Sequence, residues 1–281
     1  MEYRRLGKTG LNVSILGFGG IPIGNLEGRI PLDGETSAKE AANVVNRALD
    51  LGVNFIHTSF TYGDSAYKIG KVMKERRDDC FLAVKMQTKN KTKSETEELL
   101  KRSLEALNTD HIDIAELAVN ADVFQKAMGP DGAYEALLDA KEEGVIDFIG
   151  ITSHDVDFLT EAITTEAFSN LITPFNYVAN KAKEKLLSVA AKLDLGVIAM
   201  KTLGRGGLPE VEKALRYVWG HDIDTAIVGM NKIEQVEQLV SIATNPLQLD
   251  EEEQRHLQRI AEEIIKEGRL SKSGAVSREP Q

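Results

Sequence analysis

The chain has 281 residues, of which 42% are hydrophobic and 28% charged, enough for one large core. Its formal net charge of −10 argues against nucleic acid and anionic membranes as partners. Residues 1–10 are charged, and no stretch of about 18 unbroken apolar residues occurs, so neither secretion nor a membrane span is predicted.

Cys80 is the only cysteine of the chain. A single thiol can form neither an internal disulfide nor a Cys-x-x-Cys metal site, so we expect a reducing, cytoplasmic setting and no metal. Because Cys80 stands beside an apolar run, we expect it to be a small core residue.

Short β-branched runs alternate with amphipathic stretches along the chain. Residues 3–14 predict a small hairpin that caps the bottom of a barrel. Eight later runs are apolar almost throughout, as strands of a parallel sheet covered on both faces should be. The predicted strands are 15–18, 54–57, 81–85, 112–117, 147–152, 171–174, 196–200 and 225–228.

Helical spacing and stop signals mark the segments between these strands. Gly52 is expected to end the first helix, because glycine readily adopts the left-handed conformation of a helix C-terminus. Ser94 and Glu97 predict a capping box at the start of another. The predicted helices are 36–51, 93–107, 131–143, 181–194, 209–219, 232–243 and a charged final helix at 250–268.

Regular strand-then-helix alternation predicts an α/β fold, a (β/α)8 TIM barrel with an N-terminal hairpin cap and a C-terminal helix. A doubly wound sheet is the alternative, but no G-x-G-x-x-G follows the first strand. No linker-like stretch interrupts the chain, so residues 1–281 are predicted to form a single domain. The polar residues 270–281 are expected to be a mobile tail.

The active site of such a barrel forms at the C-terminal ends of its strands. Tyr62 follows the second predicted strand, and Lys85 ends the third. A free tyrosine has a pKa of about 10, so it needs a nearby cation to exchange protons near neutrality, and Lys85 could supply that charge. The alternatives are a hydroxyl at a loop tip and a solvated lysine at a strand end.

Two further titratable residues lie on these strands. His57 could accept a hydrogen bond from Lys85 or Tyr62, or it could be a rim histidine without a catalytic role. Glu116 would point into the barrel, where a charge is costly without a partner. We expect an ion pair with Lys85 or Lys201, which could be functional or purely structural.

Nearly the whole chain resembles the aldo-keto reductase superfamily. The match rests on the order and spacing of several blocks, any one of which would be weak. These blocks are residues 3–14 (YRRLGKTGLNVS), 16–20 (LGFGG), 62–65 (YGDS), 84–85 (VK), 111–113 (HID), 150–154 (GITSH), 214–218 (ALRYV), 229–230 (GM) and 235–237 (QVE).

The resemblance implies NAD(P)H-dependent carbonyl reduction by an aspartate, a tyrosine, a lysine and a histidine. Tyr62 matches the tyrosine that protonates the carbonyl oxygen, and Lys85 matches its partner. The aspartate position holds His57, and the histidine position holds Ala118. Half of the expected set is therefore replaced; the loss of one oxyanion donor typically costs about 10²–10³ in rate, which slows an enzyme without silencing it.

The resemblance also implies a nicotinamide cofactor, NADP(H) in preference to NAD(H). Relatives with the Thr-Ser-His segment can carry a cysteine-rich ferredoxin-like extension; this chain lacks those cysteines, so no iron–sulfur cluster is expected. The matching positions are Ser153 and His154 for the carboxamide, Met200 for the ring, Lys201, Leu203, Gly204 and Arg205 for the pyrophosphate, and Gly229, Met230, Asn231, Lys232, Gln235 and Gln238 for the adenosine end.

These features predict an oxidoreductase that reduces a small aldehyde or ketone, with Tyr62 as general acid and His57 as substitute orienter of the lysine. The first alternative is a catalytically impaired family member that acts as a nucleotide or ligand sensor, or as a partner subunit. The second is non-redox chemistry with His57 and Glu116 as acid and base. The substrate and the oligomeric state are not readable from the sequence.

Overall fold

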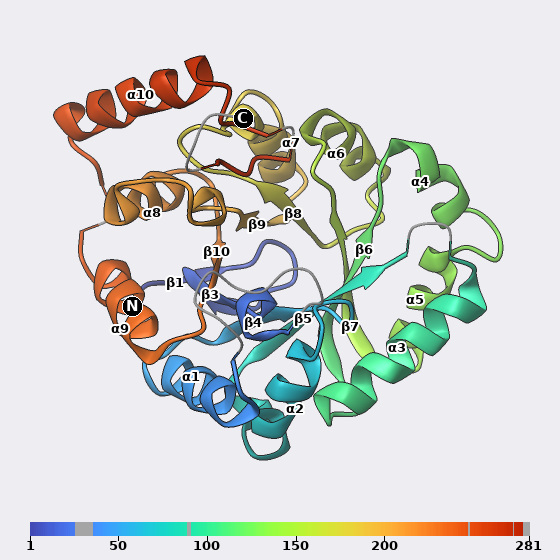
Figure 1. Cartoon of the computed structure of the whole chain (residues 1–281). Helices are drawn as coiled ribbons and strands as arrows, with labels where there is room; N and C mark the ends of the chain where they lie inside the picture. Colours follow the sequence, from blue (N-terminus) through green and yellow to red (C-terminus); the bar gives the residue numbers. More distant parts are fainter. Residues whose placement is uncertain (26–35, 89–90, 247, 272, 278–281) are drawn as a thin grey trace.

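The computed structural model describes residues 1–25, 36–88, 91–246, 248–271 and 273–277. Eight parallel strands close into a barrel in sequence order, and β10 pairs with β3 to complete it (Figure 1). The predicted (β/α)8 barrel is confirmed, and all eight predicted strands are present. They are β3 (Leu16–Gly19), β4 (Phe55–Thr58), β5 (Phe81–Gln87), β6 (Ile112–Ala118), β7 (Ile146–Thr152), β8 (Asn170–Pro174), β9 (Gly196–Met200) and β10 (Thr225–Gly229).

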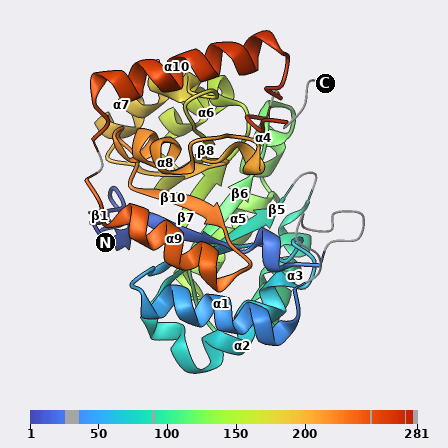
Figure 2. The same cartoon turned by 60° about the vertical axis from the view of Figure 1, so that its left-hand side comes forward.

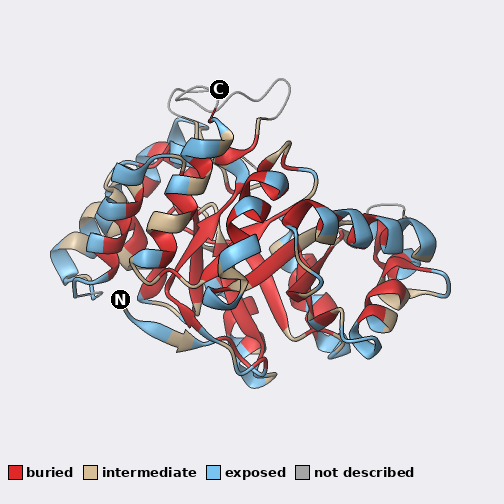
Figure 3. Cartoon of the chain, turned by 90° about the horizontal axis from the view of Figure 1, so that it is seen from below, coloured by how far each residue is buried: buried red, intermediate tan, exposed pale blue. Residues whose placement is uncertain are grey.

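Helices surround the barrel and bury their apolar faces against it. Seen from below, the strands are buried while the outer faces of the helices are exposed (Figure 3). The helices are α1 (Ala38–Asp50), α2 (Ser65–Arg76), α3 (Lys93–Leu107), α4 (Ala121–Met128), α5 (Ala133–Glu142), α6 (Val156–Ala162), α7 (Leu186–Lys192), α8 (Val211–Trp219), α9 (Ile233–Ala243) and α10 (Glu251–Lys266).

Two helix predictions need correction. The segment 181–194 is not one helix, because Lys185 has an extended φ of −143° that separates a short 3-10 turn, Lys181–Lys183, from α7. The capping box of α3 is formed by Thr92 and Glu95 rather than by Ser94 and Glu97. Both pairs have the same spacing, but α3 begins at Lys93, so Ser94 and Glu97 already lie inside the helix.

The N-terminal hairpin closes one end of the barrel, as predicted. Its strands, β1 (Tyr3–Arg5) and β2 (Asn12–Ser14), are antiparallel. Leu6 and Val13 are fully buried and pack on side chains from the lower half of the barrel interior, including Phe55 and Ile114. The opposite end, where the strands finish, is therefore the end available to a ligand.

The C-terminal part of the chain packs on the barrel further than expected. Helix α10 lies outside α8 (Figure 2), and the chain then returns to the β9–α8 loop, where Val276 is buried and donates its N–H to Gly204 O at 3.0 Å. The prediction of a mobile tail from residue 270 is therefore wrong for residues 270–271 and 273–277, which include segments hydrogen-bonded to the barrel. Residues 278–281 lie outside the described part of the chain.

Within the described residues, no helix is both long and apolar enough to cross a membrane. Cys80 is buried in the main core, where the lack of solvent raises the pKa of its thiol to about 12. This agrees with its prediction as a small core residue.

Candidate active site at the C-terminal rim of the barrel

Tyr62 lies in a well-connected loop between β4 and α2. Its N–H donates to Ser59 O at 3.0 Å, and its carbonyl accepts from Ser65 N at 3.1 Å. The Ser59 hydroxyl donates to Lys85 O at 2.8 Å and so ties this loop to the end of β5. The loop therefore fixes Tyr62, which is only 8% exposed, beside Lys85.

The structure brings Tyr62 and Lys85 together, as the sequence predicts. The Lys85 ammonium lies 4.6 Å from the centre of the Tyr62 ring, a cation–π distance. Burial, and then the negative charge of Glu116, raise the pKa of Tyr62, while Arg205 opposes the rise. The hydroxyl therefore stays protonated at neutral pH and can donate, but the phenolate left after donation is costly.

His57 and Glu116 form a buried pair beneath Tyr62. His57 Nε2 lies 3.0 Å from Glu116 Oε2, with His57 6% exposed and Glu116 fully buried. The His57 and Tyr62 rings are tilted to one another, with centroids 6.2 Å apart. The prediction that Glu116 would pair with Lys85 or Lys201 did not anticipate this partner.

The missed contact follows from the barrel geometry. Strand alternation places His57, Lys85 and Glu116 on the interior, and Lys85 is level with Glu116 in the β5–β6 ladder. The contact between His57 on β4 and Glu116 on β6 passes over β5. It depends on how far neighbouring strands are staggered, and the stagger cannot be read from the sequence pattern. The second oxygen of Glu116, Oε1, is buried and accepts no hydrogen bond among the described residues.

Cations gather at the rim around β7 and β9. Burial, and then the charges of Arg205 and Lys85, lower the pKa of Lys201 to about 8. Partial desolvation, and then the positive charges of Lys201, Lys85 and Arg205, lower the pKa of His154 to about 4. The residue as a whole is nevertheless exposed. This concentration of positive charge fits an anionic ligand.

The β9–α8 loop is tightly turned and carries two cations. Lys201, Gly204 and Arg205 all adopt the left-handed conformation, with φ of 57°, 57° and 63°. The N–H groups of Gly204 and Gly206 donate to Lys201 O and Leu203 O, each at 2.8 Å, so the side chains of Lys201 and Arg205 rather than these amides are available to an anion. Lys201 also donates to Ser273 O at 2.6 Å, so the C-terminal segment lies against this loop. Leu203 is half-buried and Met200 ends β9.

Of the residues predicted for the adenosine end, most lie between the end of β10 and the start of α9, while Met230 is buried. Gly229 ends β10, Lys232 caps α9, and Gln235 accepts a hydrogen bond from Asn231 N at 2.9 Å. Met230 is fully buried in the core and offers no surface to a ligand, so its assignment is corrected.

Gln238 and Ser153 complete the predicted cofactor set. Gln238 is exposed on α9 and lines a hollow of about 400 Å³. Glu210 and Glu212 line the same hollow, and their negative charges would repel a phosphate. Ser153 is buried after β7, and its hydroxyl accepts a hydrogen bond from Asp155 N at 3.3 Å.

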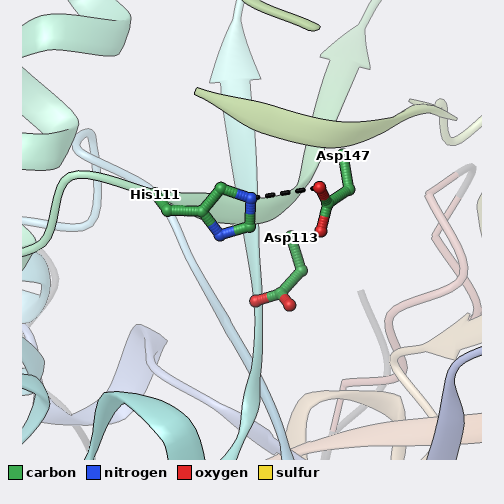
Figure 4. A group of neighbouring side chains, drawn as sticks. All are labelled: His111, Asp113 and Asp147. Carbon is green, nitrogen blue, oxygen red and sulfur yellow. Dashed lines mark ion pairs between the residues drawn. The ribbon is translucent and has the colours of Figure 1, made fainter. Parts of the chain in front are cut away.

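A second cluster of titratable groups lies where β6 and β7 begin, away from this rim. His111, Asp113 and Asp147 have ligand atoms within 4.8 Å of one another (Figure 4). Arg77 donates to Asp113 Oδ2 at 2.6 Å and lies 3.3 Å from His111 Nδ1. The Arg77 guanidinium therefore already supplies the positive charge, and the cluster is an ion-pair network.

Comparisons with known proteins agree with this geometry. The sequence profile of the Aldo/keto reductase family matches residues 15–216. The uncharacterized oxidoreductase YqkF of Bacillus subtilis (strain 168) is 26% identical over 92% of this chain and 96% of its own length. The L-galactose dehydrogenase of Arabidopsis thaliana is 27% identical over 94% of this chain and 95% of its own length.

A solved structure extends the likeness to three dimensions. The aldo-keto reductase AKR11C1 from Bacillus halodurans, in its holo form, superposes with a TM-score of 0.77 at 25% identity, covering 92% of this chain and 96% of that chain. The family profile spans most of the barrel, including the Tyr62–Lys85 pair and the cationic loop. The chain therefore belongs to the aldo/keto reductase family.

Proposed function

We propose that this protein reduces a small aldehyde or ketone with a nicotinamide dinucleotide, and that Tyr62 is the general acid. The observation that carries the proposal is the buried Tyr62 beneath the Lys85 ammonium, 4.6 Å from the ring centre, at the catalytic end of the barrel. Membership of the family supports the reaction class, and Tyr62 and Lys85 would supply its acid–base chemistry.

The residues at the rim fit an anionic dinucleotide. The positive charges of Lys201 and Arg205 suit a pyrophosphate. Ser153 and His154, after β7, would hold the carboxamide. When bound, the dihydronicotinamide supplies the hydride. Lys232, at the start of α9, favours a 2′-phosphate, and hence NADP(H) over NAD(H).

The chain's own residues handle the proton. Tyr62 is protonated at neutral pH and donates its hydroxyl proton to the carbonyl oxygen as negative charge develops there. Lys85 stabilises the phenolate that forms, because its ammonium lies against the ring. His57 would orient this pair from β4, in place of the aspartate that the resemblance implies.

Cofactor titration and a substrate panel test the proposal. NADPH and NADH should each change the fluorescence of the protein in a saturable way, and NADPH should bind more tightly. Aldehydes, ketones, sugar aldehydes and the lactone of L-galactose should then be screened for NADPH oxidation, which reports carbonyl reduction. L-galactose should be screened for NADP⁺ reduction, which reports the reverse direction. No binding at millimolar cofactor would disprove the oxidoreductase assignment, and saturable binding without any turnover would favour a sensor.

Cofactor affinity is expected to depend on pH through Lys201. The pKa of about 8 leaves Lys201 charged below pH 8 and increasingly neutral above it. A bound phosphate favours the ammonium, so binding above pH 8 requires proton uptake, and the Kd for NADPH should rise by up to about tenfold per pH unit.

Titrations of NADPH between pH 6.5 and 9.5 measure this effect. Lys201→Gln should bind more weakly at pH 7 and lose the slope above pH 8. Lys192→Gln is the matched control, because Lys192 is an exposed lysine at the end of α7. An unchanged slope in Lys201→Gln would show that Lys201 does not contact the anion.

A further inference from the structure

We propose that Glu116 is a positioning residue of this reaction: through His57, it holds a proton beneath the pocket that restores the Tyr62 hydroxyl after each turnover. The inference rests on the proposed role of Tyr62 as the acid. It assigns a role to a buried carboxylate that the Tyr62–Lys85 pair does not require.

The first argument is geometric. Glu116 Oε2 holds His57 Nε2 at 3.0 Å, and this contact fixes which edge of the imidazole faces β6. The His57 and Tyr62 ring centroids are 6.2 Å apart, and the two rings are tilted by 57°. The imidazole therefore contacts the carboxylate and has the phenol ring as a near neighbour.

The second argument concerns charge. An isolated carboxylate as deeply buried as Glu116 is costly, and it gains most when its partner carries the opposite charge. A Glu116 carboxylate with a His57 imidazolium is neutral overall and stores one transferable proton. Lys85 from β5 and Tyr62 from the β4–α2 loop face this pair, and Lys201, Arg205 and His154 surround them at the rim.

The third argument is the cost of the phenolate. Burial and the nearby carboxylate make the Tyr62 phenolate unfavourable, so it needs a proton soon after the carbonyl has taken its own. Glu116 Oε1 is buried and accepts no hydrogen bond among the described residues, which makes the contact of Oε2 with His57 more important for this carboxylate.

The proton count balances. Hydride adds to the carbonyl carbon with the two electrons that the dihydronicotinamide loses, the Tyr62 O–H bond breaks, and the alcohol O–H bond forms. The Nδ1–H bond of the His57 imidazolium then breaks as the Tyr62 O–H bond re-forms. Neutral His57 keeps its Nε2–H on Glu116 and regains one proton from water before the next turnover.

The test compares kcat across pH for five proteins: the wild type, two single variants, their double variant and a control variant. Glu116→Gln keeps the shape of the side chain but cannot stabilise an imidazolium, and His57→Asn cannot store the proton. Each variant should lose about 10²-fold in kcat at pH 8 and less at pH 6, where solvent protons are more abundant. The alkaline limb of the profile should therefore move to lower pH, with the Kd for NADPH changed less than twofold.

The double variant shows whether the two residues act as a unit. If they do, Glu116→Gln with His57→Asn should lose no more than either single variant, and multiplied losses would overturn the proposal. Ile114→Val is the matched control, because it removes a methyl group from the interior face of β6, among the apolar side chains in the lower half of the barrel. Its kcat and pH profile should equal those of the wild type.

The outcomes separate this inference from the proposed function. Wild-type turnover with an unmoved profile in Glu116→Gln would overturn the role of Glu116 and leave the reductase standing. Absence of wild-type turnover on the whole panel would remove both. If Glu116→Gln fails to fold by circular dichroism, His57→Asn decides alone, because an unmoved profile in that variant is equally fatal.

Discussion

Tyr62→Phe is expected to lower kcat by about 10²–10⁴-fold, the usual contribution of a positioned general acid. The phenyl ring keeps the packing and the contact with Lys85, but it has no proton to donate. The Kd for NADPH should change less than twofold, because the hydroxyl is absent from the cationic loop that is proposed to hold the pyrophosphate. Steady-state rates and cofactor titrations of the purified variant measure both effects.

The matched control for this variant is Tyr67→Phe. Tyr67 is 54% exposed on α2, so the same atom is removed a short distance along the chain without touching the pocket. Tyr67→Phe should retain the wild-type kcat. A Tyr62→Phe enzyme with wild-type turnover would show that another group protonates the carbonyl oxygen.

The arrangement of acid and base groups differs from the one that the resemblance implies. An aspartate is expected where β4 carries His57, and a histidine is expected where β6 ends at Ala118. Glu116 stands two residues before Ala118 and therefore on the same face of β6. Strands β4 and β6 thus contribute one imidazole and one carboxylate, which are joined at 3.0 Å.

On the proposed function, half of the set that the resemblance implies is replaced, and His57 and Glu116 keep an imidazole and a carboxylate at the site. In the expected set the carboxylate orients the lysine directly. Here Glu116 contacts the imidazole of His57, whose ring centroid lies 6.2 Å from that of Tyr62. The pair should therefore affect proton supply more strongly than cofactor binding.

The barrel was predictable because its signals are local. Apolar runs of strand length and glycine stops recur at a regular period, and Gly52 does adopt the left-handed φ, at +88°, that its role requires. The proximity of Tyr62 and Lys85 was predictable for a related reason, because Tyr62 lies in the loop after β4 and Lys85 lies near the end of the neighbouring strand β5.

What the sequence did not predict depends on contacts between distant segments. His57 meets Glu116 across an intervening strand, and the burial of Met230 depends on the helices that pack around it. The docking of residues near Val276 rests on hydrogen bonds to a loop about 70 positions earlier, including the one from Lys201 to Ser273. Composition alone marks that segment as polar, and polarity does not distinguish a free tail from a docked one.

Trp219→Ala is expected to lower the free energy of unfolding by about 3–5 kcal/mol. Trp219 ends α8, is 2% exposed, and donates its indole N–H to Ile15 O at 2.8 Å. The substitution removes a large buried ring from the junction of α8 with β3. Urea denaturation followed by circular dichroism measures the loss, because the chain has one tryptophan and its fluorescence disappears with the substitution.

Two further variants separate packing from hydrogen bonding at this junction. Trp219→Phe keeps most of the ring, and Ile15 O still accepts from Ala226 N at 2.8 Å, so this change should cost only about 1–2 kcal/mol. Leu138→Ala, at a 39% exposed position on α5, should cost less than either. A loss below about 1 kcal/mol in Trp219→Ala would contradict a tightly packed junction. Since β3 and β10 close the barrel beside this residue, the result also measures how much this closure contributes to the stability of the fold.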